Sequence, residues 1–416
     1  MHHPQAAAGK IGTSELMTQY MKAFDAGYRI FFLSASAFAV LAMIVWLVWL
    51  SVHYAGGMIT SMPFSIAPHE WHSHEMVFGY GSVAVAGFLL TAAPNWTGHN
   101  PGSRAFFLLL FLLWLAGRLA QWGSGSLPWT VVAVADLVFM PVLILRILMM
   151  LLKQPKGPQM ILLAVLGMFW AGNLSMHLEW LNLSQDTAGP GLRAGLYSLS
   201  ALIVILGGRV TPAFTRNAMM RAGYKGQTPA NPRMLAALSI ALAILVPASI
   251  LIGLPDFLVS ASAIAAGITA LIRLSMWRGI WTLRQPILWT LHLSYGLNAA
   301  GLIVLGLALA GFGSETAALH VTAIGGIGGM TVSVMSRATL GHSGRELVAP
   351  VPLAVAYGLL PAAMLLRFMA SAWTEFYFPG VLLSSVLWIA AFTLFVHSLW
   401  PSFIGASVTA GEDERA

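Results

Sequence analysis

The chain has 416 residues and a formal net charge of +7, with 58% hydrophobic but only 8% charged residues. Long uncharged runs recur along its whole length, which is typical of a protein that crosses a membrane many times. The absence of cysteine from the sequence excludes disulfides, iron–sulfur clusters and thiolate-bound metals. Any metal would therefore be bound by histidine, methionine, carboxylate or a cofactor ring.

The predicted elements begin with a polar N-terminal segment, residues 1–28, which we expect to be cytoplasmic. Residues 29–400 predict one all-α domain, a polytopic membrane bundle of twelve transmembrane helices, and residues 401–416 predict a cytoplasmic tail. Apolar runs of about 20 residues match the thickness of the hydrocarbon core of a bilayer. The expected spans lie near residues 29–52, 70–93, 104–122, 129–152, 159–180, 192–214, 234–254, 257–277, 286–312, 315–337, 350–371 and 376–400.

Basic residues indicate the orientation, because they fall in every second loop and are almost absent from the loops between. Cytoplasmic loops of membrane proteins are enriched in Lys and Arg. The basic loops carry Arg104, Arg146, Lys153, Lys156, Arg209, Arg216, Arg221, Lys225, Arg233, Arg273, Arg278, Arg284, Arg337 and Arg345. Both termini are therefore expected in the cytoplasm, and the positive charge does not indicate nucleic acid as a partner.

Ionisable residues crowd the start of the second span. The segment from His69 to Glu75 has the sequence HEWHSHE, with three imidazoles and two carboxylates. Ionisable groups at a membrane boundary are costly and mark functional sites, and imidazole is the commonest side-chain metal ligand. In a regular α-helix His72 and His74 are about 200° apart, so they cannot face the same atom. We expect one histidine to bind a metal, while another, or Glu75, orients that ligand or donates protons.

The other histidines fall into two groups by expected depth. His72, His74, His177 and His320 share the outer leaflet and are the candidate metal ligands, whereas His292, His342 and His397 lie toward the inside. For His177, His292 and His320, a buried imidazole bonded to a neighbouring helix is an equally good interpretation. The glycines that follow His320 favour a close helix–helix contact over a bed for a porphyrin.

Several further polar residues lie within the spans. Arg118 and Asp136, on consecutive spans, are expected to pair, because an unpaired buried charge is costly. Arg367 has no partner in its own span; it would either hold haem propionates or extend toward the interface. Tyr295 and Asn298 follow His292 on the same side of their span and form a candidate polar track. We detect no transporter-like internal repeat and no phosphate-binding loop in the sequence.

Motifs along most of the chain carry a family resemblance. They are Tyr28-Arg29-Ile30-Phe31-Phe32, Trp71-His72-Ser73-His74-Glu75-Met76, Phe78-Gly79, Gly87-Phe88, Pro94-Asn95-Trp96-Thr97-Gly98, Gly117-Arg118, Asn173 with His177, the run from Gly208 to Asn217, Leu291-His292, His320 with Gly325-Gly326-Ile327-Gly328, Arg337, and Leu340-Gly341-His342-Ser343-Gly344-Arg345. This pattern resembles the NnrS family, bacterial membrane proteins tied to the nitric oxide response and described as haem- and copper-containing. His69 and His397 lie outside the motifs.

The resemblance implies a multi-pass protein of the bacterial inner membrane that holds a b-type haem, with copper beside it, and reduces nitric oxide to nitrous oxide. We expect Glu75 to act as the acid, and the bilayer, nitric oxide and a quinol or external redox protein to be the partners. The candidate cofactor-binding residues are His74, His177, His292, His320, His342, Arg118 and Arg367. Two alternatives remain open: a transporter or exporter of a metal or nitrosyl-metal species, and a nitric oxide sensor without turnover. The optical spectrum of the purified protein would separate a haem protein from a transporter.

Overall fold

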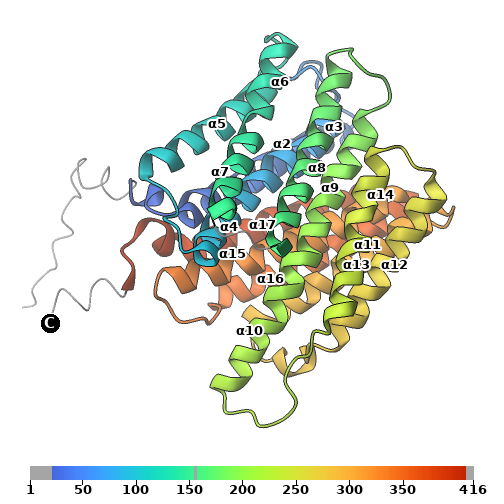
Figure 1. The fold of residues 1–416 in the computed structure, drawn as a ribbon. Coiled ribbons are helices and arrows are strands. Elements are labelled where there is room, and N and C mark those ends of the chain that lie inside the picture. The colour runs from blue at the N-terminus through green and yellow to red at the C-terminus, as the bar shows by residue number, and fades with distance from the viewer. Residues whose placement is uncertain (1–20, 154–156, 409–416) are drawn as a thin grey trace, which may run out of the picture.

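The computed structural model describes residues 21–153 and 157–408. Within them the chain is all-α, and twelve helical segments are long and apolar enough to cross a membrane, which confirms the predicted fold class and the number of spans (Figure 1). Most of the predicted N-terminal segment (residues 1–20) and half of the predicted tail (residues 409–416) lie outside the described residues. The orientation of the termini stays a prediction.

The spans follow the predicted ranges closely. In chain order they are α2 (Gly27–Tyr54); α3 (Pro68–His74), η2 (Glu75–Tyr80) and α4 (Gly81–Thr97); α5 (Arg104–Trp122); α6 (Trp129–Leu137) with α7 (Phe139–Lys153); α8 (Gly157–Trp180); α9 (Ala188–Leu202), η3 (Ile203–Gly207) and α10 (Gly208–Arg221); α11 (Arg233–Leu251); α12 (Asp256–Ser275); α13 (Pro286–Leu309); α14 (Glu315–His320), η5 (Val321–Gly328) and α15 (Gly329–His342); α16 (Val351–Ala372); and α17 (Tyr377–Ile404). We call the end of the bundle where α2 begins the near end, and the end where α2 stops the far end.

Three spans are interrupted by a π-helical segment: η2, η3 and η5. A π-helical turn takes one extra residue, so it shifts the faces that the rest of the span turns to its neighbours. The apolar periodicity of these spans predicts regular α-helices, so the π-helical segments differ from that expectation. Such segments occur often at functional sites, and η2 begins at Glu75, in the segment rich in histidine.

The helix packing repeats every four spans, although no repeat was evident in the sequence. Within each set of four, the first two spans pack together (α2 with α4, α8 with α9, α13 with η5), and so do the last two (α5 with α6, α11 with α12, α16 with α17). The first set packs against the second through α7 and α8, and the second against the third through α12 and α13. The third set packs back against the first through α17 and α2, so the three sets form a closed ring. The three spans with π-helical segments are the second members of these sets, and α9 contacts both η2 and η5.

The glycines that follow His320 form the predicted helix–helix contact. A Cβ atom placed on Gly325 would lie 3.0 Å from the side chain of Leu297, and one on Gly326 would lie 2.9 Å from the Cα atom of Asn298. These residues therefore allow η5 and α13 to approach closely, and they leave no room for a flat cofactor between the two helices.

Candidate metal centre and neighbouring cavities

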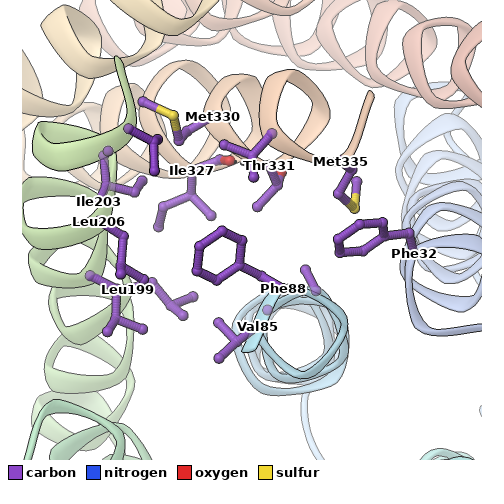
Figure 2. A pocket seen from close by; sticks show the side chains of 16 residues that line it. Phe32, Val85, Phe88, Leu199, Ile203, Leu206, Ile327, Met330, Thr331 and Met335 are labelled. Carbon is purple, nitrogen blue, oxygen red and sulfur yellow. Dashed lines mark hydrogen bonds between the residues drawn. The ribbon is translucent and has the colours of Figure 1, made fainter. Parts of the chain in front are cut away.

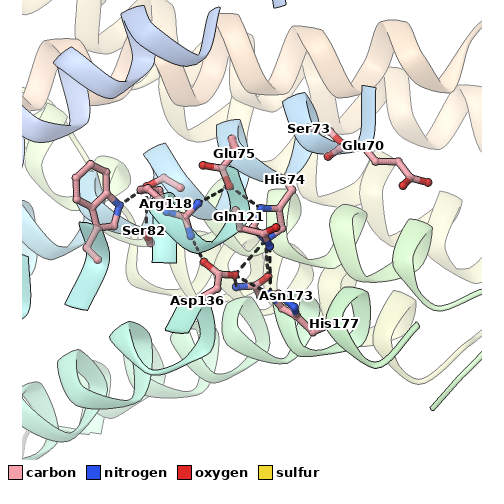
Figure 3. A network of polar contacts seen from close by, with 12 residues as sticks. Glu70, Ser73, His74, Glu75, Ser82, Arg118, Gln121, Asp136, Asn173 and His177 are labelled. Atoms are coloured by element: carbon pink, nitrogen blue, oxygen red, sulfur yellow. Dashed lines mark hydrogen bonds and ion pairs between the residues drawn. The ribbon is translucent and has the colours of Figure 1, made fainter. Parts of the chain in front are cut away.

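A buried group of polar side chains lies at the far end of the bundle, where four consecutive spans meet (Figure 3). The side chains come from α3 with η2, α5, α6 and α8. We call this group the polar cluster; its members are His74, Glu75, Arg118, Gln121, Asp136, Asn173 and His177.

Asp136 joins these helices at the centre of the polar cluster. Its Oδ1 atom accepts a hydrogen bond from Nη2 of Arg118, which confirms the predicted pair. Its Oδ2 atom lies 2.8 Å from Nε2 of His177 and 3.2 Å from Nε2 of His74. The same oxygen accepts a hydrogen bond of 2.8 Å from Nδ2 of Asn173. One carboxylate thus connects α6 to three other helical segments.

Glu75 holds the opposite edge of His74. Its Oε1 atom accepts a hydrogen bond of 2.6 Å from Nη1 of Arg118 and lies 2.9 Å from Nδ1 of His74. Because an ionised carboxylate can only accept, the proton of His74 lies on Nδ1, and the lone pair of Nε2 points into the cluster. There it meets Oδ2 of Asp136 and, at 2.9 Å, Oδ1 of Asn173. A cation between these lone pairs would relieve their repulsion, either as a second proton on His74 or as a metal ion.

The charge balance of the polar cluster gives the same result. The side chains of His74 and His177 are fully buried, and Glu75, Asp136 and Arg118 are between 1% and 7% exposed. With neutral imidazoles, two carboxylates and one guanidinium leave one uncompensated negative charge. An uncompensated charge in a dry interior is costly, so one bound cation would stabilise the fold.

Two glycines make room for these charged groups. A Cβ atom on Gly79 would lie 2.6 Å from Nη1 of Arg118, and one on Gly117 would lie 3.0 Å from the Cα atom of Asp136. Gly79 lies in η2, so the π-helical segment and its glycine together let the guanidinium pass close to the backbone. Any larger residue at either position would push Arg118 or Asp136 away from its partner.

The polar cluster offers a suitable set of donor atoms for a transition metal. Nε2 of His74, Nε2 of His177 and Oδ2 of Asp136 belong to a group whose ligand atoms lie within 4.8 Å of one another. Nδ1 of His177 and Oε1 of Gln121 have no hydrogen-bond partner among the described residues. Imidazole and carboxylate donors bind zinc, iron and copper ions, and a ligating histidine whose other ring nitrogen contacts a carboxylate is the usual arrangement at such sites. The residues therefore fit a metal ion.

His72 and His320 face a separate space at the far end. They line a cavity of about 390 Å³ together with Arg367, and we call it the far-end cavity. Nδ1 of His320 lies 2.7 Å from the carbonyl oxygen of Thr316, so it carries the proton and leaves Nε2 free to bind a metal. Nδ1 of His72 is buried without a partner among the described residues. Arg367 is 7% exposed and donates a hydrogen bond of 2.6 Å to Ser371.

The predicted divergence of His72 and His74 is confirmed. The ring of His72 stacks on Trp46 at 4.5 Å on the side of the far-end cavity, while His74 turns into the polar cluster. Of the predicted outer group, His74 and His177 therefore belong to the polar cluster, whereas His72 and His320 line the far-end cavity. His69 is exposed and also lines the far-end cavity.

The histidines of the predicted inner group lie apart from both places. His292 is buried on α13, and its Nε2 atom lies 2.9 Å from Oγ1 of Thr215, as expected for an imidazole bonded to a neighbouring helix. Tyr295 accepts a hydrogen bond of 3.1 Å from Arg273. His342 is exposed at the near end, where its ring stacks on Tyr28 at 5.6 Å.

The sequence did not predict that Asp136, Asn173 and Gln121 belong to the polar cluster. Asp136 was assigned only to Arg118, although a lone carboxylate inside an apolar span is itself a candidate ligand. Asn173 was noted only because it lies one turn before His177. Gln121 was not singled out, yet it follows Arg118 by three residues and therefore shares its helix face. The Nε2 atom of Gln121 lies 3.5 Å from Nε2 of both His74 and His177.

An apolar pocket of about 80 Å³ lies between η3 with α10, α4 and η5 with α15 (Figure 2). It shares Leu199 and Ile327 with the far-end cavity. On its other side it adjoins a further cavity toward the near end. The two spaces have Phe32, Phe88, Val210 and Val334 in common. The far-end cavity, the apolar pocket and the further cavity therefore form a series through the bundle. The apolar pocket, in the middle, has the smallest volume.

A protein-family model matches the chain. The family model described as NnrS protein matches residues 22–406, which is nearly the whole chain and covers all twelve spans. Among curated proteins, none matches the chain significantly.

Proposed function

The chain belongs to the NnrS family, a family of the nitric oxide response, and from this premise we propose that it is a haem and copper protein that binds nitric oxide and reduces it to nitrous oxide. The observation that carries the proposal is the buried set of His74, Asp136 and His177, whose ligand atoms lie within 4.8 Å of one another. The twelve apolar spans make it a multi-pass membrane protein. The bacterial inner membrane is part of the proposal.

The copper ion would be held by His74, His177 and Asp136. A metal cation there would separate the lone pairs on Nε2 of His74 and Oδ2 of Asp136, which lie 3.2 Å apart. It would also balance the excess negative charge of the polar cluster. Glu75 would fix the ring of His74 through Nδ1, and Arg118 would hold both carboxylates in place.

The haem would be held in the far-end cavity. A volume of about 390 Å³ is within the usual range for small-molecule sites. His72 and His320 would offer imidazoles to its iron, and the guanidinium of Arg367 would offer a partner for a propionate. Trp46 and Trp388 line the same space and would pack against a flat ring.

The bound metals would provide a place for nitric oxide and a route for electrons from a quinol or an external redox protein. Joining two nitric oxide molecules into nitrous oxide and water consumes two electrons and two protons. Oε2 of Glu75 would be the atom that passes such a proton on, because Arg118 and His74 both contact Oε1 and leave Oε2 free of them. The buried surround excludes water, and nitric oxide is apolar enough to arrive through the bilayer.

The optical spectrum of protein purified from the membrane and washed tests the haem part of the proposal. We expect a Soret band that persists in the wild type, is reduced in His72→Ala and His320→Ala, and is unchanged in the control His397→Ala, since His397 is exposed on α17. A colourless wild-type protein would contradict the haem assignment. Equal Soret bands in all variants would contradict the choice of ligands.

The successive cavities favour a second candidate function, the transport of a metal or nitrosyl-metal species across the membrane. The apolar pocket shares lining residues with the cavities on both sides, as a closed passage would. Proteoliposomes loaded with a copper-sensitive dye separate the two functions. Copper uptake that is lost when Ala84, in the wall of the pocket, is changed to Phe would support transport, whereas nitric oxide consumption without uptake would support the enzyme.

A further inference from the structure

A cavity with one charged residue in its lining lies toward the near end of the bundle, away from the polar cluster. It has a volume of about 450 Å³, and we call it the near-end cavity. On α4 it is lined by Phe88, Thr91, Ala92, Asn95 and Trp96, and on α15 by Val334, Arg337, Ala338, Gly341 and His342. Both series have the spacing of one helix face. Two whole helix faces and the side chains of α10 therefore enclose this space.

Arg337 is the only charged residue in the lining of the near-end cavity. Its side chain is buried, at 7% exposed, and its guanidinium carbon lies 4.1 Å from the centre of the Phe214 ring. Within residues 21–153 and 157–408, no carboxylate or other hydrogen-bond acceptor engages it. This differs from Arg118, which has two carboxylates, and from Arg367, which has a hydroxyl.

A buried guanidinium without a counter-charge is costly. The contact with Phe214 compensates part of that cost, but it uses the face of the guanidinium. The N–H groups at its edge remain for an acceptor with two oxygens, which is the geometry of a carboxylate or a phosphate. The near-end cavity therefore suits an anion.

The remaining walls indicate what the anion is attached to. Phe32, Phe88, Trp96 and Phe214 line the same cavity, and the rings of Phe88 and Trp96 meet edge to face at 6.4 Å. Aromatic side chains in such arrangements pack well against a flat ring. A volume of 450 Å³ is also much larger than an inorganic ion requires.

The near-end cavity has a polar mouth. Asn95 and His342 are exposed, and with Thr91 they also line a wider space of about 740 Å³ that reaches Lys22 and Arg29. The carboxylate in that wider space, Asp25, is engaged by Arg104. A basic approach of this kind attracts anions to a site.

We propose that the near-end cavity binds a small organic anion with a flat aromatic body, whose carboxylate or phosphate group pairs with Arg337. The aromatic body lies among Phe88, Trp96 and Phe214, and His342 and Asn95 line the route of entry. This inference does not depend on the proposed function, because that function places the haem and the copper ion at the far end and uses neither Arg337 nor His342.

Titration calorimetry with phenyl phosphate as the probe tests the proposal, on the full chain in maltoside micelles, which contain no phosphate. We expect binding that Arg337→Gln weakens by at least about tenfold, since the substitution removes the charge-assisted hydrogen bonds to the phosphate. Ala338→Phe, which fills the cavity and keeps the arginine, should weaken binding equally. The control Arg284→Gln removes an exposed arginine and should leave the dissociation constant unchanged.

Three results would overturn the proposal. The first is equal binding of phenyl phosphate by the wild type and by both cavity variants. The second is equally tight binding of inorganic phosphate, which would remove the role of the aromatic walls. The third is binding in micelles that disappears in phosphatidylglycerol nanodiscs, because a lipid phosphate would then be the natural partner of Arg337.

Discussion

The Nε2 atom of His177 lies 2.8 Å from the Oδ2 atom of Asp136, although the two residues are 41 positions apart in the chain. This contact joins the end of α8 to α6, whose Asp136 the sequence connects only to Arg118. It makes Asp136 the common partner of an arginine and two histidines. The metal assignment depends on this geometry.

The ion pairs of the polar cluster should be strongly coupled. Arg118→Gln leaves two buried carboxylates without a guanidinium, and removing one partner of a buried pair costs about 3–5 kcal/mol. Changing Glu75 to Gln as well removes one of those carboxylates, so the double variant should be more stable than Arg118→Gln alone. Thermal unfolding in detergent measures both effects.

The matched control for this coupling is the pair of Arg104 and Asp25, whose side chains are 62% and 37% exposed. Exposed pairs contribute about 0–1 kcal/mol, so Arg104→Gln should hardly change the unfolding temperature. If Arg118→Gln were as stable as the wild type, the cluster would not depend on its charge balance.

Glu75→Gln should slow nitric oxide consumption more than it weakens gas binding. The substitution keeps the shape of the side chain but removes the acid, and general acid catalysis contributes about a hundredfold or more. A nitric oxide electrode with nitrous oxide detection measures turnover, and optical titration measures binding. Glu70→Gln, one turn earlier on α3, is the control and should behave as the wild type. Uptake of only one equivalent per haem, without nitrous oxide, would indicate a binder or sensor instead of an enzyme.

The alternation of basic loops predicts the topology. A reporter fused after Arg216 should be found in the cytoplasm, and one fused near Gly125 should be found outside, because positive loops stay inside. Gly125 lies in the loop between α5 and α6, at the far end, close to the polar cluster. The reverse pair of locations would put the polar cluster and the far-end cavity on the cytoplasmic side.

Much of the fold could be predicted from the sequence, because each span is a separate apolar run closed by turn residues. The pairing of Arg118 with Asp136 was also predictable, since each is a lone charge in an apolar span. So was the divergence of His72 and His74, which follows from helix geometry over two residues. These predictions use short-range periodicity or the high cost of a buried charge.

The geometry of the candidate sites could not be predicted from the sequence, because it depends on contacts between helices that are distant in the chain. Nothing local indicates that His177 and His74 approach the same carboxylate, or that His320 joins His72 instead. The π-helical segments η2, η3 and η5 could not be predicted either. The extra residue in such a turn is stabilised by packing against other helices, and it leaves no clear pattern in the local sequence. The four-span repeat appears only in the contacts between helices.

The copper content of protein that has been loaded with copper, washed and analysed by mass spectrometry tests whether the polar cluster is a metal site. We predict that the wild type and His397→Ala retain a stoichiometric ion. His177→Ala and Asp136→Asn should retain at least about tenfold less while they remain folded in the membrane. Equal copper in all four proteins, or none in the wild type, would contradict the central claim and leave a proton on His74 as the cation of the polar cluster.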